Sequence, residues 1–266
     1  MNILILAASP RTGSTYFQNT VIPQKYFENF SYTPEGRDKM WLSSPPEMPY
    51  PIHISPYGEI HLMGERWAYP STDLIKIVEH SDEPDTKRFF RKVLEDRYLD
   101  DKQMIAEWKW WYKTDSKNTI RVVKAFPSHF VQKGLTDISE LLKHTHKVYL
   151  LFRKDYTAVV YSQLAAYKTN NYGPDRKKET INISKKEFDQ MAEHTFSNYR
   201  DALGFVSGWH GDVEVVCLEE DLPHQPYKNN YTFNNPQFEV DREFKKFYNE
   251  FRRLGLPFAV TKRFDK

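Results

Sequence analysis

The sequence predicts an α/β protein in which a central parallel sheet carries helices on both faces. Short apolar runs alternate along the chain with longer segments of helical periodicity. The apolar runs are continuous, as is typical of strands buried on both faces of a parallel sheet. Strands that alternate with helices favour parallel pairing through crossover helices, so one domain over residues 1–266 is the simplest interpretation. The strand order stays open.

Four segments are predicted strands, and the rest of the regular structure is predicted helix. The strands are expected at 2–8, 119–126, 146–153 and 213–219. The helices are expected at 14–27, 135–144, 155–168, 185–209 and 241–254. Dense prolines between residues 31 and 70, followed by charged helical sequence, predict an irregular and helical insertion at about 31–113. A second insertion is expected at about 170–184.

Composition excludes several broad classes of function. The net charge is only +2, which gives no general reason to expect nucleic acid or an acidic membrane as a partner. Cys217 is the only cysteine, so an internal disulfide and a cysteine-based zinc site are both excluded. The N-terminal apolar run is too short for a membrane span, and no later run reaches the required length. We therefore expect a soluble cytoplasmic protein and leave its oligomeric state open.

The first predicted strand leads into the loop "SPRTGST" at residues 9–15. Backbone amides at the start of a helix have no helical partners and can bind an anion, helped by the helix dipole. Gly13 lets the backbone approach closely, and Arg11 adds a fixed positive charge. The amides or hydroxyls that would take part belong to Thr12, Gly13, Ser14 and Thr15. An ordinary strand-to-helix turn capped by Ser14 or Thr15 fits the same residues.

A second candidate phosphate site follows the strand expected at 146–153. Arg153 ends that strand, and Ser162 lies on the next predicted helix, so the two could hold one phosphate at the carboxyl edge of the sheet. The alternative is an arginine in a salt bridge and a serine on a helix surface. No lysine follows Gly13, where a nucleotide triphosphatase carries one, so a nucleotide kinase is the less favoured class.

Together the two motifs resemble those of sulfotransferases that use 3′-phosphoadenosine 5′-phosphosulfate (PAPS). "SPRTGSTYF" (9–17) resembles the 5′-phosphosulfate loop, and "RKDYTAVVYS" (153–162) resembles the 3′-phosphate motif. The Arg-x-Asp start and the nine-residue offset from arginine to serine are similar to the bacterial carbohydrate branch, including trehalose 2-sulfotransferases. "VVKAFP" (122–127) and "VCLEEDL" (216–222) are similar to further family strands, whereas the two insertions match no family segment.

The resemblance implies a P-loop-like three-layer sandwich as the fold and PAPS as the co-substrate. It also implies a reaction and a set of site residues. The implied reaction moves the sulfuryl group of PAPS to a hydroxyl, expected on a carbohydrate or glycolipid, without a metal ion. The 5′-phosphosulfate would be held by Arg11 and the amides of residues 12–15, and the 3′-phosphate by Arg153 and Ser162. Lys124, in "VVKAFP", would be a second cation at the reacting centre; a lysine at the water-exposed end of a strand is the alternative.

The general base is expected just after the first helix, because the resembled branch uses a glutamate there. Glu35 is the first choice, with Glu28 and His61 as alternatives, and each of the three could also be an ordinary surface charge. A tryptophan cluster is formed by Trp108, Trp110 and Trp111. These side chains could stack on a sugar, or they could pack in the core. A non-catalytic nucleotide- or phosphate-binding protein on the same fold is the alternative function, since fold alone does not fix activity.

Overall fold

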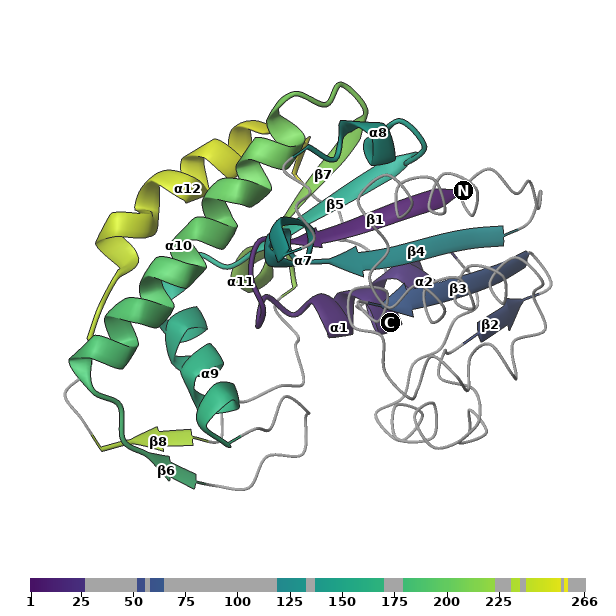
Figure 1. Ribbon diagram of the computed structural model, residues 1–266. Helices are drawn as coiled ribbons and strands as arrows, with labels where there is room; N and C mark the ends of the chain where they lie inside the picture. The colour runs from purple at the N-terminus through teal and green to yellow at the C-terminus, as the bar shows by residue number, and fades with distance from the viewer. Residues whose placement is uncertain are drawn as a thin grey trace. The chain divides into compact units, whose positions relative to one another are not determined.

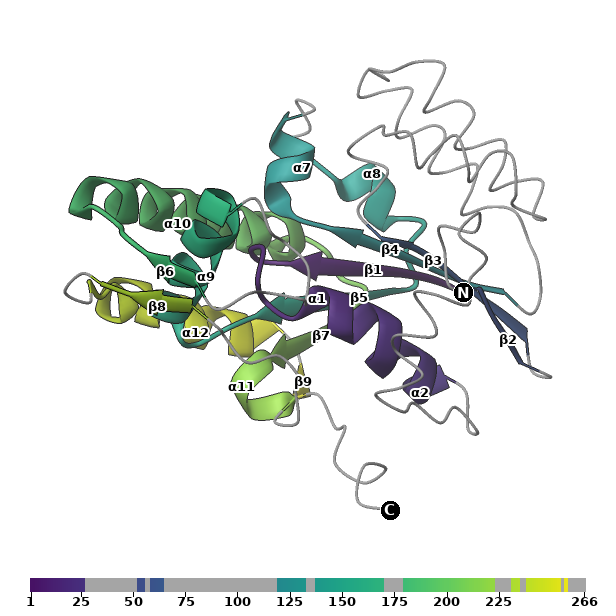
Figure 2. The same ribbon diagram turned by 90° about the horizontal axis from the view of Figure 1, so that it is seen from below.

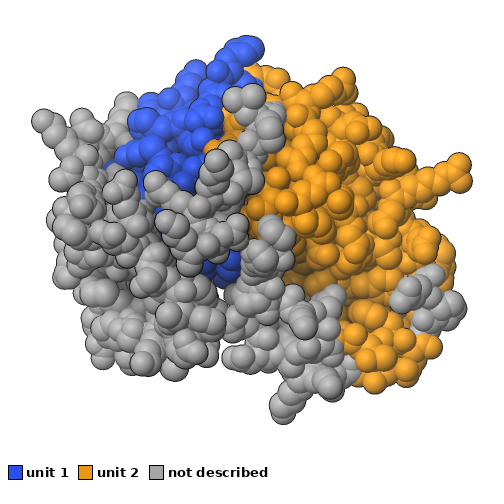
Figure 3. Space-filling model, turned by 180° about the vertical axis from the view of Figure 1, so that it is seen from behind, with its two compact units in different colours: residues 1–5, 15–148, 209–212 blue, residues 6–14, 149–208, 213–266 orange. Residues whose placement is uncertain are grey.

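The computed structural model describes residues 1–26, 52–55, 58–64, 119–132, 137–169, 179–222, 231–234, 238–254 and 256–257. The chain forms two compact units, which Figure 3 shows in separate colours. Unit 1 comprises residues 1–5, 15–148 and 209–212, and unit 2 comprises residues 6–14, 149–208 and 213–266.

The described residues contain a seven-stranded sheet with the order β2-β3-β4-β1-β5-β7-β9 (Figure 1; β9 is labelled in Figure 2). Its strands are β1 (Asn2–Ala7), β2 (Ile52–Ser55), β3 (Gly58–Gly64), β4 (Thr119–Ala125), β5 (Lys147–Phe152), β7 (Asp212–Cys217) and β9 (Leu256–Pro257). Strand β3 runs parallel to β4, and β7 runs parallel to β9, whereas β2 at the edge is antiparallel to β3. The α/β class with a parallel central sheet is therefore confirmed.

The first insertion contains more regular structure than its sequence predicts. Strands β2 and β3 lie inside the stretch at 31–113, where we expected irregular and helical structure, so the expectation was wrong for these residues. The dense prolines were the reason for expecting irregular structure, but Pro51 and Pro56 only flank β2 and leave its four residues uninterrupted. Proline is tolerated next to edge strands, where it removes no central ladder bond. The rest of the insertion lies outside the described residues.

In unit 1, a helical run follows the first loop. It consists of α1 (Ser14–Tyr16, whose first residue belongs to unit 2), the π-helical turn η1 (Phe17–Val21) and α2 (Ile22–Tyr26), close to the helix expected at 14–27. Helix α7 (Pro127–Gln132) was not expected, and α8 (Ser139–Leu142) is shorter than the helix expected at 135–144. Phe17 and Val21 are buried on the run, and η1 contacts β3.

In unit 2, three helices pack through an aromatic core. They are α9 (Tyr156–Thr169), α10 (Lys185–Ser207) and α12 (Asp241–Leu254), and α10 lies beside α12 in both ribbon views (Figures 1 and 2). The ring of Tyr199 on α10 lies 5.8 Å from Phe244 and 5.6 Å from Phe247 on α12. Tyr156 of α9 joins the same cluster, 5.2 Å from Tyr199. All four rings are buried, so this core holds the helices that carry the candidate site.

Unit 2 also contains a two-stranded parallel sheet of β6 (Glu179–Ile181) and β8 (Tyr231–Phe233). Strand β6 lies inside the insertion expected at about 170–184, and β8 lies where we expected neither a strand nor a helix, so the sequence analysis missed both strands. Three residues are too few for a strand periodicity to be recognised. The ring of Phe233 on β8 lies 4.6 Å from that of Tyr161 on α9. None of the helices in the described ranges is both long and apolar enough to cross a bilayer.

Candidate anion-binding site

The loop after β1, residues 9–14 of unit 2, has a strained backbone. Arg11 has a φ of 72° and Gly13 a φ of 74°, and within the described part of the chain Arg11 is the only non-glycine residue with a positive φ. A side chain in that region costs free energy, and such strain is concentrated at functional sites. Thr12 lies between them without a positive φ. Residues with a positive φ occur in the nests of successive backbone N–H groups that bind anions.

Hydrogen bonds from buried side chains hold this loop in place. The hydroxyl of Thr12 donates to the carbonyl oxygen of Ser9 at 2.9 Å, and both residues are fully buried. The amide nitrogen of Gln163 on α9 donates to Ser9 Oγ at 2.9 Å and to Thr195 Oγ1 on α10 at 2.9 Å. Sequence reasoning missed Gln163, although an amide within the apolar run "VVYSQLAA" was a signal for a buried polar contact.

Arg11 and Ser162, predicted to bind different ends of one donor, lie in contact. Arg11 Nε donates to Ser162 Oγ over 3.1 Å, although the two residues are 151 positions apart. An arginine nitrogen can only donate, so the serine oxygen must accept, and its own hydrogen can go to a second acceptor. Ser162 is 4% exposed on α9. This pair places one positive charge and one hydroxyl donor beside the strained loop within unit 2.

Arg153 lies at the end of β5 and is paired with Glu219 at the start of α11 (Leu218–Asp221). Its Nε is 2.7 Å from Glu219 Oε1, and the two side chains are 19% and 22% exposed. The other carboxylate oxygen accepts the backbone N–H of Lys154 at 3.0 Å. Burial alone would raise the pKa of Glu219, but the hydrogen bond and charge of Arg153 outweigh it, and the pKa is lowered. Among the described residues Arg153 contacts Glu219 and Tyr199 rather than Ser162.

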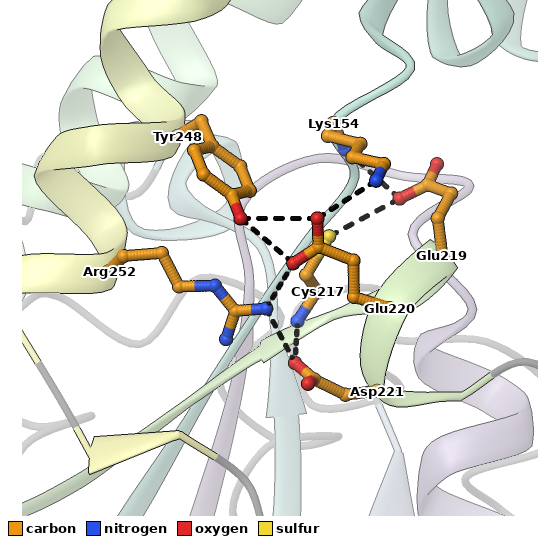
Figure 4. Close-up of polar contacts among 7 residues, drawn as sticks. All are labelled: Lys154, Cys217, Glu219, Glu220, Asp221, Tyr248 and Arg252. Atoms are coloured by element: carbon orange, nitrogen blue, oxygen red, sulfur yellow. Dashed lines mark hydrogen bonds and ion pairs between the residues drawn. The ribbon is translucent and has the colours of Figure 1, made fainter.

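The acidic residues after β7 also anchor α12 (Figure 4). Glu220 accepts hydrogen bonds from Lys154 Nζ at 2.8 Å, Arg252 Nη2 at 2.6 Å and Tyr248 Oη at 2.9 Å. Arg252 Nη2 also lies 3.1 Å from Asp221. Burial opposes the charge on Glu220, but these donors prevail and lower its pKa to about 2. The acidic residues of the "VCLEEDL" segment are thus engaged in ion pairs that join the residues after β5 to α11 and α12.

In unit 1, Lys124 on β4 contacts Thr15, the last residue of the "SPRTGST" motif. Its Nζ donates to Thr15 Oγ1 at 3.1 Å, and Lys124 is only 5% exposed. A buried ammonium is retained where polar partners compensate for lost water. The structure therefore brings together two residues that were selected from separate motifs, and Lys124 is not the solvent-exposed lysine of the alternative interpretation.

The candidate bases lie outside the described side chains. Glu28, Glu35 and the cluster of Trp108, Trp110 and Trp111 lie outside the described residues, and His61 lies in β3 without a described side chain. Where side chains are described, no three of His, Cys, Asp or Glu are grouped so as to hold a metal ion. Comparison with models of protein families, with curated proteins and with solved structures finds no match to this chain.

Proposed function

We propose that this protein is a sulfotransferase that moves the sulfuryl group of PAPS to a hydroxyl of a carbohydrate or glycolipid. The observation that carries the proposal is the 3.1 Å contact between Arg11 and Ser162, one residue from each of the two family-like motifs. The positive φ values at Arg11 and Gly13 add further support, because such conformations occur in the backbone nests that bind anions. A P-loop-like three-layer sandwich is the architecture that goes with this proposal.

In the proposed reaction the acceptor oxygen attacks sulfur in line with the bridging oxygen of the donor. The new O–S bond forms as the bridging S–O bond breaks, and adenosine 3′,5′-bisphosphate leaves. Negative charge grows on the bridging oxygen and the 5′-phosphate. Arg11 and the amides of residues 12–15 would stabilise that charge, and preorganised donors of this kind are often the largest catalytic contribution. Lys124 would add a second positive charge there.

The remaining roles concern the 3′-phosphate of the donor and the acceptor hydroxyl. Arg153 and Ser162 would hold the 3′-phosphate. Glu219 accepts a hydrogen bond from Nε of Arg153, and the phosphate would be bound by the terminal nitrogens of the guanidinium, which are not part of that contact. The acceptor hydroxyl must lose a proton, and Glu35 is the first choice to take it, with His61 and Glu28 as alternatives. No step of this transfer requires a metal ion.

A non-catalytic nucleotide-binding protein is the second candidate, because the strained loop with Arg11 and Ser162 suits anion binding and needs no base. The deciding experiment incubates the protein with [³⁵S]PAPS and a panel of sugars, glycolipids, peptides and phenols. We expect a labelled sugar or glycolipid, and a loss of roughly 10²–10³ in rate for Arg11→Ala. Tight binding of adenosine 3′,5′-bisphosphate without any labelled product would favour the non-catalytic protein. Magnesium-dependent use of ATP would favour a kinase.

A further inference from the structure

Gln163 lies beneath the loop and is 6% exposed, in the middle of the buried face of α9. Both hydrogen bonds from its amide nitrogen, to Ser9 Oγ and to Thr195 Oγ1, measure 2.9 Å. A primary amide nitrogen has two hydrogens, so these two contacts use its full donor capacity. The side chain, carried by α9, therefore links Ser9 in the loop after β1 to α10.

The orientation of this amide is fixed from α10. Thr195 Oγ1 donates its one hydrogen to the carbonyl oxygen of Met191 at 2.8 Å, one helical turn earlier. The threonine oxygen can then only accept from Gln163, so the atom facing it must be the amide nitrogen and not the amide oxygen. Thr195 is fully buried, and an amide oxygen facing a hydroxyl oxygen that has no hydrogen to donate would be strongly disfavoured. The second hydrogen of the nitrogen is directed to Ser9 as a consequence.

We propose that Gln163 is the positioning residue of the anion-binding loop. Gln163 donates a hydrogen bond to the side-chain oxygen of Ser9, and the hydroxyl of Thr12 donates one to the carbonyl oxygen of Ser9. Both the side chain and the backbone of Ser9 are therefore held in place. The preceding residue of α9, Ser162, holds the side chain of Arg11. Two consecutive residues of one helix thus fix where the loop begins and where its cation lies. The proposal rests on the proposed function in one respect, that this loop binds the anionic part of the nucleotide.

The positive φ of Arg11 explains why the loop needs to be held in place. A non-glycine residue keeps a positive φ only where its surroundings determine the backbone conformation. If the hydrogen bond to Ser9 is lost, the loop can relax toward ordinary φ values, which changes the directions of its backbone amides. The protein would then stay folded, because the aromatic core of α9, α10 and α12 is untouched, but it would bind the anion less well.

The test measures the Kd of adenosine 3′,5′-bisphosphate by calorimetry and the Tm of each variant. Gln163→Met keeps the shape and removes both donors, so we expect binding about 2- to 10-fold weaker, the value of one neutral hydrogen bond. Thr195→Val should weaken binding similarly, whereas Thr195→Ser keeps the hydroxyl and should restore wild-type affinity. Gln190→Met, an exposed glutamine on α10, is the matched control and should bind as the wild type does.

A mutant cycle then identifies the bond through which Gln163 acts. In a Ser9→Ala background, Gln163→Met should change Kd by less than about twofold, because the shared hydrogen bond is already absent. Variants that lower Tm but bind with wild-type Kd would show a purely structural role and overturn the proposal, as would equal binding by Thr195→Val and Thr195→Ser.

Pyrophosphate, measured on the same variants, separates this proposal from the proposed function. If the wild type binds pyrophosphate but not the nucleotide, the sulfotransferase proposal fails, and the same pattern of variants with pyrophosphate would still support Gln163. If the wild type binds neither anion, the loop is not an anion site and both proposals fail.

Discussion

Replacing Arg153 should remove the preference of this protein for a 3′-phosphorylated nucleotide. Its proposed ligand, the 3′-phosphate, is present in adenosine 3′,5′-bisphosphate and absent from adenosine 5′-monophosphate. A hydrogen bond to a charged group contributes about 1.5–3 kcal/mol, so Arg153→Ala should weaken the bisphosphate by roughly 10- to 150-fold. The monophosphate should lose less than about twofold, because the 5′-phosphate is assigned to the loop.

The structure also sets the stability cost of this change. Arg153→Ala leaves Glu219 without its 2.7 Å partner, while the backbone N–H of Lys154 still donates to the other carboxylate oxygen. Losing one partner of a mostly buried group costs about 1–3 kcal/mol, which a folded domain can tolerate. Arg153→Lys keeps a positive charge opposite Glu219 but loses the planar fork, so it should fall between the wild type and the alanine variant in affinity.

Calorimetric titration of both nucleotides gives the ratio of the two Kd values for each variant. Lys154→Ala is the matched control, because it removes one positive charge from the next residue, whose Nζ is 2.8 Å from Glu220. Its ratio should equal that of the wild type. If Arg153→Ala weakens both nucleotides by the same factor, Arg153 is a structural partner of Glu219 and the 3′-phosphate assignment is refuted.

Three further predictions concern the metal, the base and acid stability. Binding of adenosine 3′,5′-bisphosphate should be unchanged by excess EDTA, and a calorimetric requirement for magnesium would count against the mechanism. Of Glu35→Gln and His61→Asn, compared at saturating donor, at least one should lower turnover; full activity in both would place the base elsewhere. The pKa of Glu220 falls from 4.5 to about 2 on folding, so its contribution to stability is present above pH 4.5 and is lost toward pH 2. Glu220→Gln should therefore lower the free energy of unfolding by about 1 kcal/mol at pH 7 and flatten its fall between these pH values; an unchanged acid profile in urea titrations would contradict this.

The strands and helices that the sequence predicts correctly are those whose pattern is local and long. The apolar run of β1 and the amphipathic helix α12, found at the expected 241–254, are recognisable without knowing their neighbours. Strands β6 and β8 are three residues each and pair with each other, and Phe233 of β8 packs against Tyr161 of α9. Short strands of that kind carry too little pattern of their own.

The candidate site shows the same division between local and tertiary information. The loop with Arg11 and the helix with Ser162 could be selected from their motifs, but their direct contact could not, because each motif was assigned its own phosphate. Gln163 was missed since one buried amide has no sequence periodicity, and its role depends on α10. The partner of Arg153 was left open between a phosphate and a carboxylate, and Glu219 provides a carboxylate.

The packing of α12 on α10 has a consequence for the synthesis of this chain. Helix α10 leaves the ribosome before α12, so Tyr199 and Phe196 are made before Phe244 and Phe247, the rings that cover them. Until the later helix emerges, the nascent chain presents a band of uncovered aromatic side chains. Exposed apolar surface of this kind promotes association between unfinished chains and attracts chaperones. Slow translation between these two helices would therefore lengthen the time for which this aromatic surface is uncovered.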